Sequence, residues 1–328
     1  MEAELQVVKK RVKEYLNQFT HNTLSFDGWS SKGHDEIYTV HITNFLRRSF
    51  LVDGLLLTGT STTGEEIFNR LVPIIMTFDP NKMSLVVTDS GKNVCKSRRL
   101  ICTRWQWILN IPDANHLLNL LAKDLVVGSK TYPKVKGFSD VLATVSQFTT
   151  YFAHSNYGRY WLDQEMKQEV DKRGIVAAGG MRFSTFSTNG KSVVRCWPAM
   201  KRCVEKNVLK FEGKGPKKVK QLLEDVTHGL RFQAELSTVL EILSLIERGL
   251  RTLEGQNTTL SDVFMVFLGI GIAFMEVFGN SQRSIYEYRE ESFAAYNRRL
   301  AFLLEESSDD VFLLAYLLDP SPYYTSSY

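Results

Sequence analysis

The chain has few of the residues that interrupt regular structure. Only 8 of its 328 residues are proline, and no stretch is rich in glycine or serine. This composition argues against an architecture dominated by linkers. Hydrophobic residues make up 44% and charged residues 23% of the chain, which are ordinary values for packed proteins and exclude wholesale disorder. A chain of this length predicts two domains, or one domain with a large insertion.

Cysteine and long apolar runs are also scarce. Four cysteines, at positions 95, 102, 196 and 203, are too few for a disulfide scaffold. The longest apolar run, residues 263–275, has 13 residues. A bilayer span needs about 20, so the run predicts a buried helix. The first residues, MEAELQVVKKRVKEYL, lack the apolar segment of a secretion signal. We therefore expect a soluble intracellular protein that is not secreted and has no membrane partner.

Several common catalytic motifs are absent. The chain has no GxxxxGKS/T, no GxGxxG after a strand, no HExxH and no GxSxG. Nucleotide hydrolysis of the P-loop type and serine hydrolysis therefore have no support in the sequence. Cys95, Cys102 and His116 also lack the paired close spacings of a structural zinc site.

The net charge of +4 conceals a strong asymmetry along the chain. Residues 181–220 hold eleven Lys/Arg and two Glu, a net charge of +9. Residues 221–328 hold seven Arg and sixteen Asp/Glu, a net charge of −9. The split predicts a basic face for a polyanion beside an acidic helical part. A solvated, lysine-rich loop would give the same pattern.

Hydrophobic periodicity predicts an α/β domain followed by a helical one. Residues 1–22 are predicted to form an amphipathic helix. Over 23–133, strand-like and helix-like apolar patterns alternate and predict the order β-β-β-α-β-α-β-α. From residue 134 to 328 the strand pattern disappears, and five segments predict helices: 138–172, 192–210, 216–254, 259–280 and 285–318. Residues 174–190 are predicted to be a long loop.

Two aspartates stand at the ends of predicted strands. Asp27 ends the first strand, in SFDGWSS, and Asp89 ends the fourth, in VVTDSGKN. Right-handed crossovers and short connections place these strands side by side in a ribonuclease H-like mixed sheet. Two carboxylates at one sheet edge can bridge Mg²⁺ ions for phosphoryl transfer, although such sites need a third or fourth acid. An Asp before Gly or Ser is also a common turn former or helix cap.

Two further groups of residues suit contacts with nucleic acid. His116 and Asn119 share one face of a predicted helix and could touch a phosphate or orient the aspartates. Alternatively, His116 is a helix N-terminal residue satisfied by a backbone group. Downstream, basic residues alternate with aromatics, which suits phosphate contacts and base stacking, although such aromatics more commonly pack between helices. This second group comprises Arg182, Phe183, Phe186, Arg195, Trp197, Lys201 and Arg202, followed by Lys217 and Lys218.

The order and spacing of these motifs resemble the transposases of the hAT superfamily, over residues 20–325. The motifs are SFDGWSS, VVTDSGKN, PDANHLLNLLAKD, MRFSTF and AYLLDPSPYY. The resemblance is closest to transposase-derived proteins of fungi and plants. It implies a nuclear protein that acts on DNA, with a ribonuclease H-like domain, an all-helical insertion, and an Asp-Asp-Glu triad that uses Mg²⁺ or Mn²⁺. Asp27 and Asp89 match the first two acids, His116 the histidine of a Cys-x-x-His element, and Arg182-Phe183 an Arg-Trp pair that stacks on a flipped base.

The departures from this pattern decide the function that we expect. Asp113 stands where the family has cysteine, Phe183 replaces tryptophan, and no zinc finger or third acid is recognisable. The sequence therefore predicts a catalytically incomplete remnant that retains DNA binding. One alternative is an active metal-dependent nuclease or transposase that takes its third acid from the insertion or from a partner chain, as in a homo-oligomer. The other alternative is a scaffold that binds other proteins.

Overall fold

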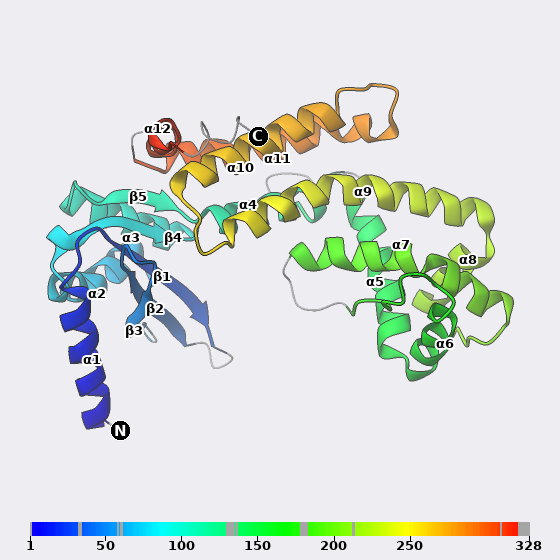
Figure 1. Ribbon diagram of the computed structural model, residues 1–328, viewed down its shortest axis with the longest axis horizontal. Coiled ribbons are helices and arrows are strands. Elements are labelled where there is room, and N and C mark those ends of the chain that lie inside the picture. Colours follow the sequence, from blue (N-terminus) through cyan, green and yellow to red (C-terminus); the bar gives the residue numbers. More distant parts are fainter. Residues whose placement is uncertain are drawn as a thin grey trace. The chain divides into compact units, whose positions relative to one another are not determined.

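The computed structural model describes residues 2–31, 35–57, 59, 62–128, 135, 137–177, 183–211, 214–308 and 310–320. The chain is an α/β protein with one mixed five-stranded sheet and many helices (Figure 1). It divides into two compact units. The sheet unit comprises Met1–Leu117, Glu254–Phe264 and Leu300–Tyr328, and the helical unit comprises Leu118–Leu253 and Met265–Arg299. This division differs from the predicted ranges in two ways: the first stretch of the sheet unit ends at Leu117 instead of residue 133, and two late segments belong to the sheet unit.

The sheet has the strand order β3-β2-β1-β4-β5. Antiparallel pairing joins β1 to β2 and β2 to β3, whereas β1 pairs with β4, and β4 with β5, in parallel. The predicted meander and the neighbouring positions of the first and fourth strands are confirmed. The bounds are Asn22–Ser30 for β1, Glu36–Thr43 for β2, Ser49–Leu56 for β3, Met83–Thr88 for β4 and Leu109–Pro112 for β5.

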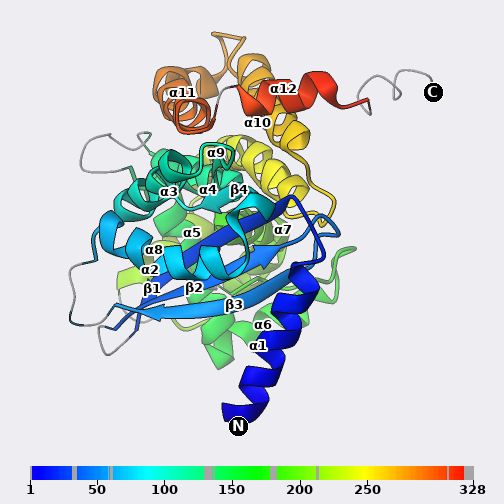
Figure 2. The same cartoon turned by 90° about the vertical axis from the view of Figure 1, so that its left-hand side faces the viewer.

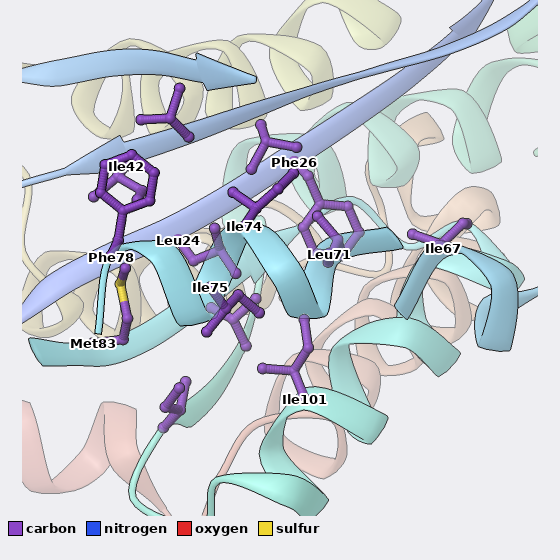
Figure 3. Close-up of a cluster of buried hydrophobic side chains, with 14 of the residues drawn as sticks. Leu24, Phe26, Ile42, Ile67, Leu71, Ile74, Ile75, Phe78, Met83 and Ile101 are labelled. Atoms are coloured by element: carbon purple, nitrogen blue, oxygen red, sulfur yellow. The ribbon is translucent and has the colours of Figure 1, made fainter. Parts of the chain in front are cut away.

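One face of the sheet carries the hydrophobic core of this unit. Leu24 of β1 lies in register with Ile42 of β2 and with Val86 of β4, and all three are fully buried. Helices α2 (Gly64–Thr77) and α3 (Lys92–Arg104) contribute the other side of this core, which Figure 3 shows. The Thr63 hydroxyl caps α2 by accepting the Glu66 N–H at 3.2 Å. Core burial of this kind contributes about 1.5–3 kcal/mol per large aliphatic side chain.

Both ends of the described chain contribute to the sheet unit. Helix α1 (Glu2–Leu16) contacts β3, and its last residue, Leu16, is buried in the core (Figure 2). Late in the chain, the Ser308 N–H donates to Asn110 O at 3.0 Å, and the Asn110 N–H donates to the Ser308 hydroxyl at 2.9 Å. These bonds satisfy backbone groups of β5, an edge strand that would otherwise be open. Helix α12 (Val311–Leu318) follows.

The helical unit corresponds to most of the region in which strands were not predicted. The predicted helix over 138–172 is two helices, α5 (Phe138–His154) and α6 (Asn156–Met166), because the Ser155 hydroxyl accepts the Gly158 N–H and starts a new helix. The predicted loop over 174–190 is wrong at its end, because α7 (Phe183–Glu205) already begins there. The helical unit also contains α8 (Lys214–Glu224), α9 (Val226–Leu253) and η2 (Ser284–Tyr288). It shares α4 (Ala114–Val126), α10 (Leu260–Val277) and α11 (Arg289–Glu305) with the sheet unit.

Helix α10 contains the longest apolar run and is buried on one face only. Phe267, Ile270 and Phe274 are buried, whereas Leu268 and Ile272 are exposed. The predicted buried helix is therefore half-covered. Among the described residues, α10 is the one helix long and apolar enough to cross a membrane by length and composition, a test that core helices of soluble proteins also pass.

Candidate functional site

Three aspartates lie at the same level on the three parallel strands of the sheet. Ser25 of β1, Val87 of β4 and Ile111 of β5 are paired in register across the three strands. Each acid lies two residues after one of them. The acids are therefore Asp27, Asp89 and Asp113. The prediction that Asp27 ends its strand is wrong, because β1 continues to Ser30 and Asp27 pairs with Thr39 inside it, whereas Asp89 directly follows β4 and Asp113 directly follows β5. Since alternate residues of a strand point to the same face, the Asp27 carboxylate belongs to the sheet face that carries Ser25, opposite the core. Asp27 is exposed, and the other two are half-buried.

A hollow of about 360 Å³ opens where these strands end. The structure brings together three of the residues predicted for the site in its wall: Asp27, Asp89 and His116. It adds Asp113 and a polar floor from the face of the sheet opposite the core. The full lining is Ser25, Phe26, Asp27, Thr39, His41, Val87, Thr88, Asp89, Asp113 and His116. The predicted contact residue Asn119 is half-buried on α4 and does not line the hollow.

A buried arginine fixes the backbone on which Asp89 stands. The Arg98 side chain is fully buried, and it donates to Thr88 O and to Asp89 O, each at 3.2 Å, and to the Thr88 hydroxyl. Burial lowers the pKa of Arg98. The Asp89 carboxylate itself accepts the Gly91 N–H at 3.0 Å. Asp89 is therefore a turn former as well as a wall of the hollow. No pattern in the sequence predicts that Arg98, a basic residue of a helix, holds this backbone.

Asp113 has both a structural and a site position. Its Oδ1 accepts the backbone N–H of Asn115 at 2.9 Å and that of His116 at 3.2 Å, so it caps the start of α4. Its own N–H donates to Thr88 O at 2.8 Å, which ties it to β4. His116 is thus a residue of the first turn of α4, as the alternative prediction placed it, and its backbone N–H is bonded to the side chain of Asp113. Asp113 follows a predicted strand, as Asp89 does, but its level beside Asp89 depends on the register of β5.

The negative charges of the hollow act on a neighbouring phenol. Gly28 lies opposite Tyr38 on β2, and a Cβ at position 28 would come within 2.4 Å of the tyrosine ring. Glycine is therefore required beside Asp27 to admit this ring. The pKa of Tyr38 is raised, chiefly by burial and then by the charges of Glu36, Asp89 and Asp27.

The donors of this hollow suit one divalent cation better than two. Among the described residues, no three His, Cys, Asp or Glu side chains form a group that could hold a metal ion. Adjacent strands are about 4.8 Å apart, so Asp27 and Asp113, two strands apart, are too distant to share an ion with Asp89 easily. Mg²⁺ commonly uses one or two carboxylates and completes its shell with water and phosphate oxygens. Asp27 and Asp89 fit that smaller requirement.

Most of the predicted basic contacts bind groups of the protein itself. Arg195 donates to Arg173 O at 2.9 Å and to Gly174 O at 2.8 Å. Arg202 pairs with Glu165 and Glu169, and Lys218 donates to the Thr144 hydroxyl at 3.0 Å. These groups are thus already used within the helical unit. Lys217 is exposed and Lys201 is half-buried.

The aromatic residues predicted beside them have a different outcome. Trp197 is buried and packs against Phe148 and Phe232, with ring centroids 5.4 and 5.8 Å away, so the packing alternative is correct for it. Arg182 lies outside the described residues. Phe183 begins α7, and its side chain is likewise outside the described part.

Comparison with known proteins does not assign the chain to a family. No family model matches the chain, and no curated protein matches it.

Proposed function

We propose that the sheet unit is a ribonuclease H-like module that binds nucleic-acid phosphate through one divalent cation held by Asp27 and Asp89. The strand order β3-β2-β1-β4-β5, with only β2 antiparallel to its neighbours, supports this fold. The resemblance of the motifs to hAT transposases makes DNA the proposed polymer and the nucleus the proposed location. On this proposal the protein is a transposase-derived DNA-binding protein.

One observation carries the proposal. Asp27 within β1 and Asp89 directly after β4 lie level on adjacent parallel strands and line one hollow at the carboxyl end of β4. Ligands of open α/β sheets bind at the carboxyl ends of strands. Among the described residues, neither carboxylate has a basic side chain as an ion-pair partner that would compete with a cation.

The individual side chains would divide the work of binding. Asp27 and Asp89 would hold Mg²⁺ or Mn²⁺, which supplies the positive charge that a phosphate oxygen needs. Arg98 holds the Asp89 backbone through its hydrogen bond to Asp89 O. His116 and His41, in the same wall, can donate to phosphate or to water beside the cation.

We propose binding without cleavage, because two-metal phosphoryl transfer needs carboxylates that hold both ions. Asp27 and Asp89 are two acids, and no third ligand completes a group with them among the described residues. Asp113 favours a second candidate, an active nuclease, because it shares the hollow. In this candidate, removal of its helix-capping bonds would free the third acid.

Fluorescence anisotropy of labelled duplex DNA tests the proposal, with Mg²⁺ and EDTA compared at constant ionic strength. We expect DNA to bind more tightly in Mg²⁺ than in EDTA. Either Asp27→Asn or Asp89→Asn should weaken the binding in Mg²⁺ by about tenfold or more. Asp53→Asn is the matched control, since Asp53 is a carboxylate of β3 paired with Lys9 and outside the hollow. Equal affinity in Mg²⁺ and EDTA, or an equal loss in the control, would sink the proposal.

The same preparation separates binding from cleavage. Incubation of plasmid DNA with Mn²⁺ should leave it intact. Nicking that disappears in Asp27→Asn and in Asp113→Asn would instead establish the nuclease candidate.

A further inference from the structure

Helix α6 presents aromatic side chains to solvent. Tyr157, Tyr160 and Trp161 have the spacing i, i+3 and i+4, which places them on one helix face. Tyr157 is 45% exposed and Tyr160 55% exposed, although tyrosine rings of this size usually gain from burial. Both rings pack edge-on against Trp161, with centroids 6.4 and 5.3 Å away.

This exposed face is held on a fixed support. The opposite side of α6 is buried through Gly158, Leu162 and Met166. At Gly158 a Cβ would lie 3.1 Å from Tyr151 O, so glycine allows α6 to approach α5 closely. The Ser155 cap fixes the first turn of α6. The aromatic rings therefore project from a packed helix rather than from a loop.

One cation lies beside the aromatic rings. The Lys210 ammonium lies 5.9 Å from the Tyr157 ring centroid, and it makes no ion pair with any described residue. Its backbone is anchored, because the Tyr151 hydroxyl donates to Lys210 O at 2.8 Å. Arg159 is two residues from Tyr157 and therefore lies on another face of α6, where it pairs with Asp163 at 3.8 Å.

We infer that this aromatic patch, formed by Tyr157, Tyr160, Trp161 and Lys210, binds unpaired bases of single-stranded nucleic acid. Proteins that bind single strands without sequence preference combine aromatic platforms, on which bases stack, with cations that contact the backbone. The tyrosine rings supply the platforms, and Lys210 supplies a phosphate contact. The patch uses no metal ion and belongs to the helical unit, so it does not depend on the Asp27–Asp89 hollow.

The salt dependence expected of the patch follows from its one cation. Each neutralised phosphate of a single strand contributes about −0.7 to the slope of log K against log salt concentration. One contact therefore predicts a slope of about −0.7, and Lys210→Gln should remove it. Stacking supplies the rest of the affinity and persists at high salt.

The test is fluorescence anisotropy of labelled oligo-dT with the whole protein in EDTA. We expect binding that Tyr157→Ala/Tyr160→Ala weakens by about tenfold or more, whereas Tyr157→Phe/Tyr160→Phe keeps it, because stacking uses the ring face. Tyr286→Ala is the matched control: Tyr286 is a 38% exposed tyrosine of the same unit with Arg289 over its ring, outside the patch. Circular dichroism verifies that each variant is folded.

Three results would overturn the inference: no binding of oligo-dT, equal affinity in the double alanine variant, or an equal loss in the Tyr286 control. Preference for duplex over single strand would also contradict it. Asp27→Asn should leave this EDTA-resistant binding unchanged. Failure of the cation-dependent proposal for the hollow is therefore recognisable separately from failure of the aromatic patch.

Discussion

Gly28 illustrates how one absent side chain shapes the candidate site. Because a Cβ at this position would lie 2.4 Å from the Tyr38 ring, Gly28→Ala must displace the ring or the strand beside Asp27. We expect a loss of about 1–3 kcal/mol in the free energy of unfolding, the usual cost of overpacking. Urea denaturation measures this loss. The Mg²⁺-dependent part of DNA binding should fall with it.

The matched control for Gly28 is Gly54, on β3. A Cβ there would meet only Tyr38 O, at an ordinary 3.8 Å, so Gly54→Ala should be nearly neutral. Replacement of Tyr38 by alanine should in turn make Gly28→Ala milder, because the clashing ring is gone. Additive losses in the double variant would contradict the packing explanation.

Asp124 is a second residue whose role the structure identifies as structural. It is 5% exposed and accepts bonds from Arg299 at 2.8 and 2.9 Å and from Arg298 at 3.2 Å. Asp124→Ala should cost about 1.5–3 kcal/mol, because it removes the buried carboxylate that binds both guanidinium groups, whose side chains are 23% and 18% exposed. Asp163→Ala, which breaks an exposed pair with Arg159, should cost less than about 1 kcal/mol. Chemical denaturation of the two variants checks the difference.

At the residue scale, the sequence predicted two of the three acids in the hollow. Asp27 lies in one recognisable strand and Asp89 follows another, and the crossover rule places those strands side by side. Asp113 was treated only as a departure from a motif. Its place depends on the register of β5, which propensity and periodicity do not report. Arg98 was not recognisable either, because its four bonds join residues that meet only in the fold.

At the element scale, a buried acid between two helices should make the helical unit sensitive to acid. Glu247 of α9 accepts bonds from Ser187 and Lys191 of α7 at 2.6 and 2.8 Å. Burial alone would raise the pKa of Glu247, but these bonds, with Arg251, outweigh burial and lower it. A lowered folded pKa gives stability that is present above the unfolded pKa and is lost as pH falls through the folded value.

Glu247→Gln tests this sign. At neutral pH the variant should be less stable than the natural protein by about 1–3 kcal/mol, and the difference should shrink below about pH 4 as the glutamate protonates. Urea denaturation across a pH series measures it. Glu241→Gln on the same helix is the control, because its ion pair with Arg283 is exposed. A difference that grows in acid would contradict the proposed pKa direction.

Element boundaries failed where packing outweighed local preference. Serine, threonine and glycine around residues 184–190 favour a loop, yet this segment is helical. At Gly190 a Cβ would come within 2.8 Å of Leu240, so the glycine serves the close approach of α7 to α9 instead of ending a helix. The strands were easier to predict, since their apolar alternation reflects the single buried face of the sheet.

At the scale of the whole molecule, the sheet unit is assembled from three stretches of chain. Asn110 connects the first stretch to the last: it exchanges backbone and hydroxyl bonds with Ser308, 198 residues away, and its amide donates to Glu306 O. Its side-chain oxygen also accepts from buried Arg98. Local sequence patterns cannot report such a connection, which is why the late helices were predicted to belong to the helical domain alone.

Asn110→Ala should therefore loosen residues far apart in sequence. Loss of the amide leaves the Arg98 Nε–H and the Glu306 carbonyl without this partner, although Arg98 keeps its bonds to β4, so we expect about 1–3 kcal/mol of destabilisation. Hydrogen exchange followed by mass spectrometry should show faster exchange both in β5 and in α12. Asn81→Ala is the control, since the Asn81 side chain bonds only to exposed Asp79. Faster exchange confined to β5 would mean that the last stretch holds its place without Asn110, and the sheet unit would then not depend on this connection.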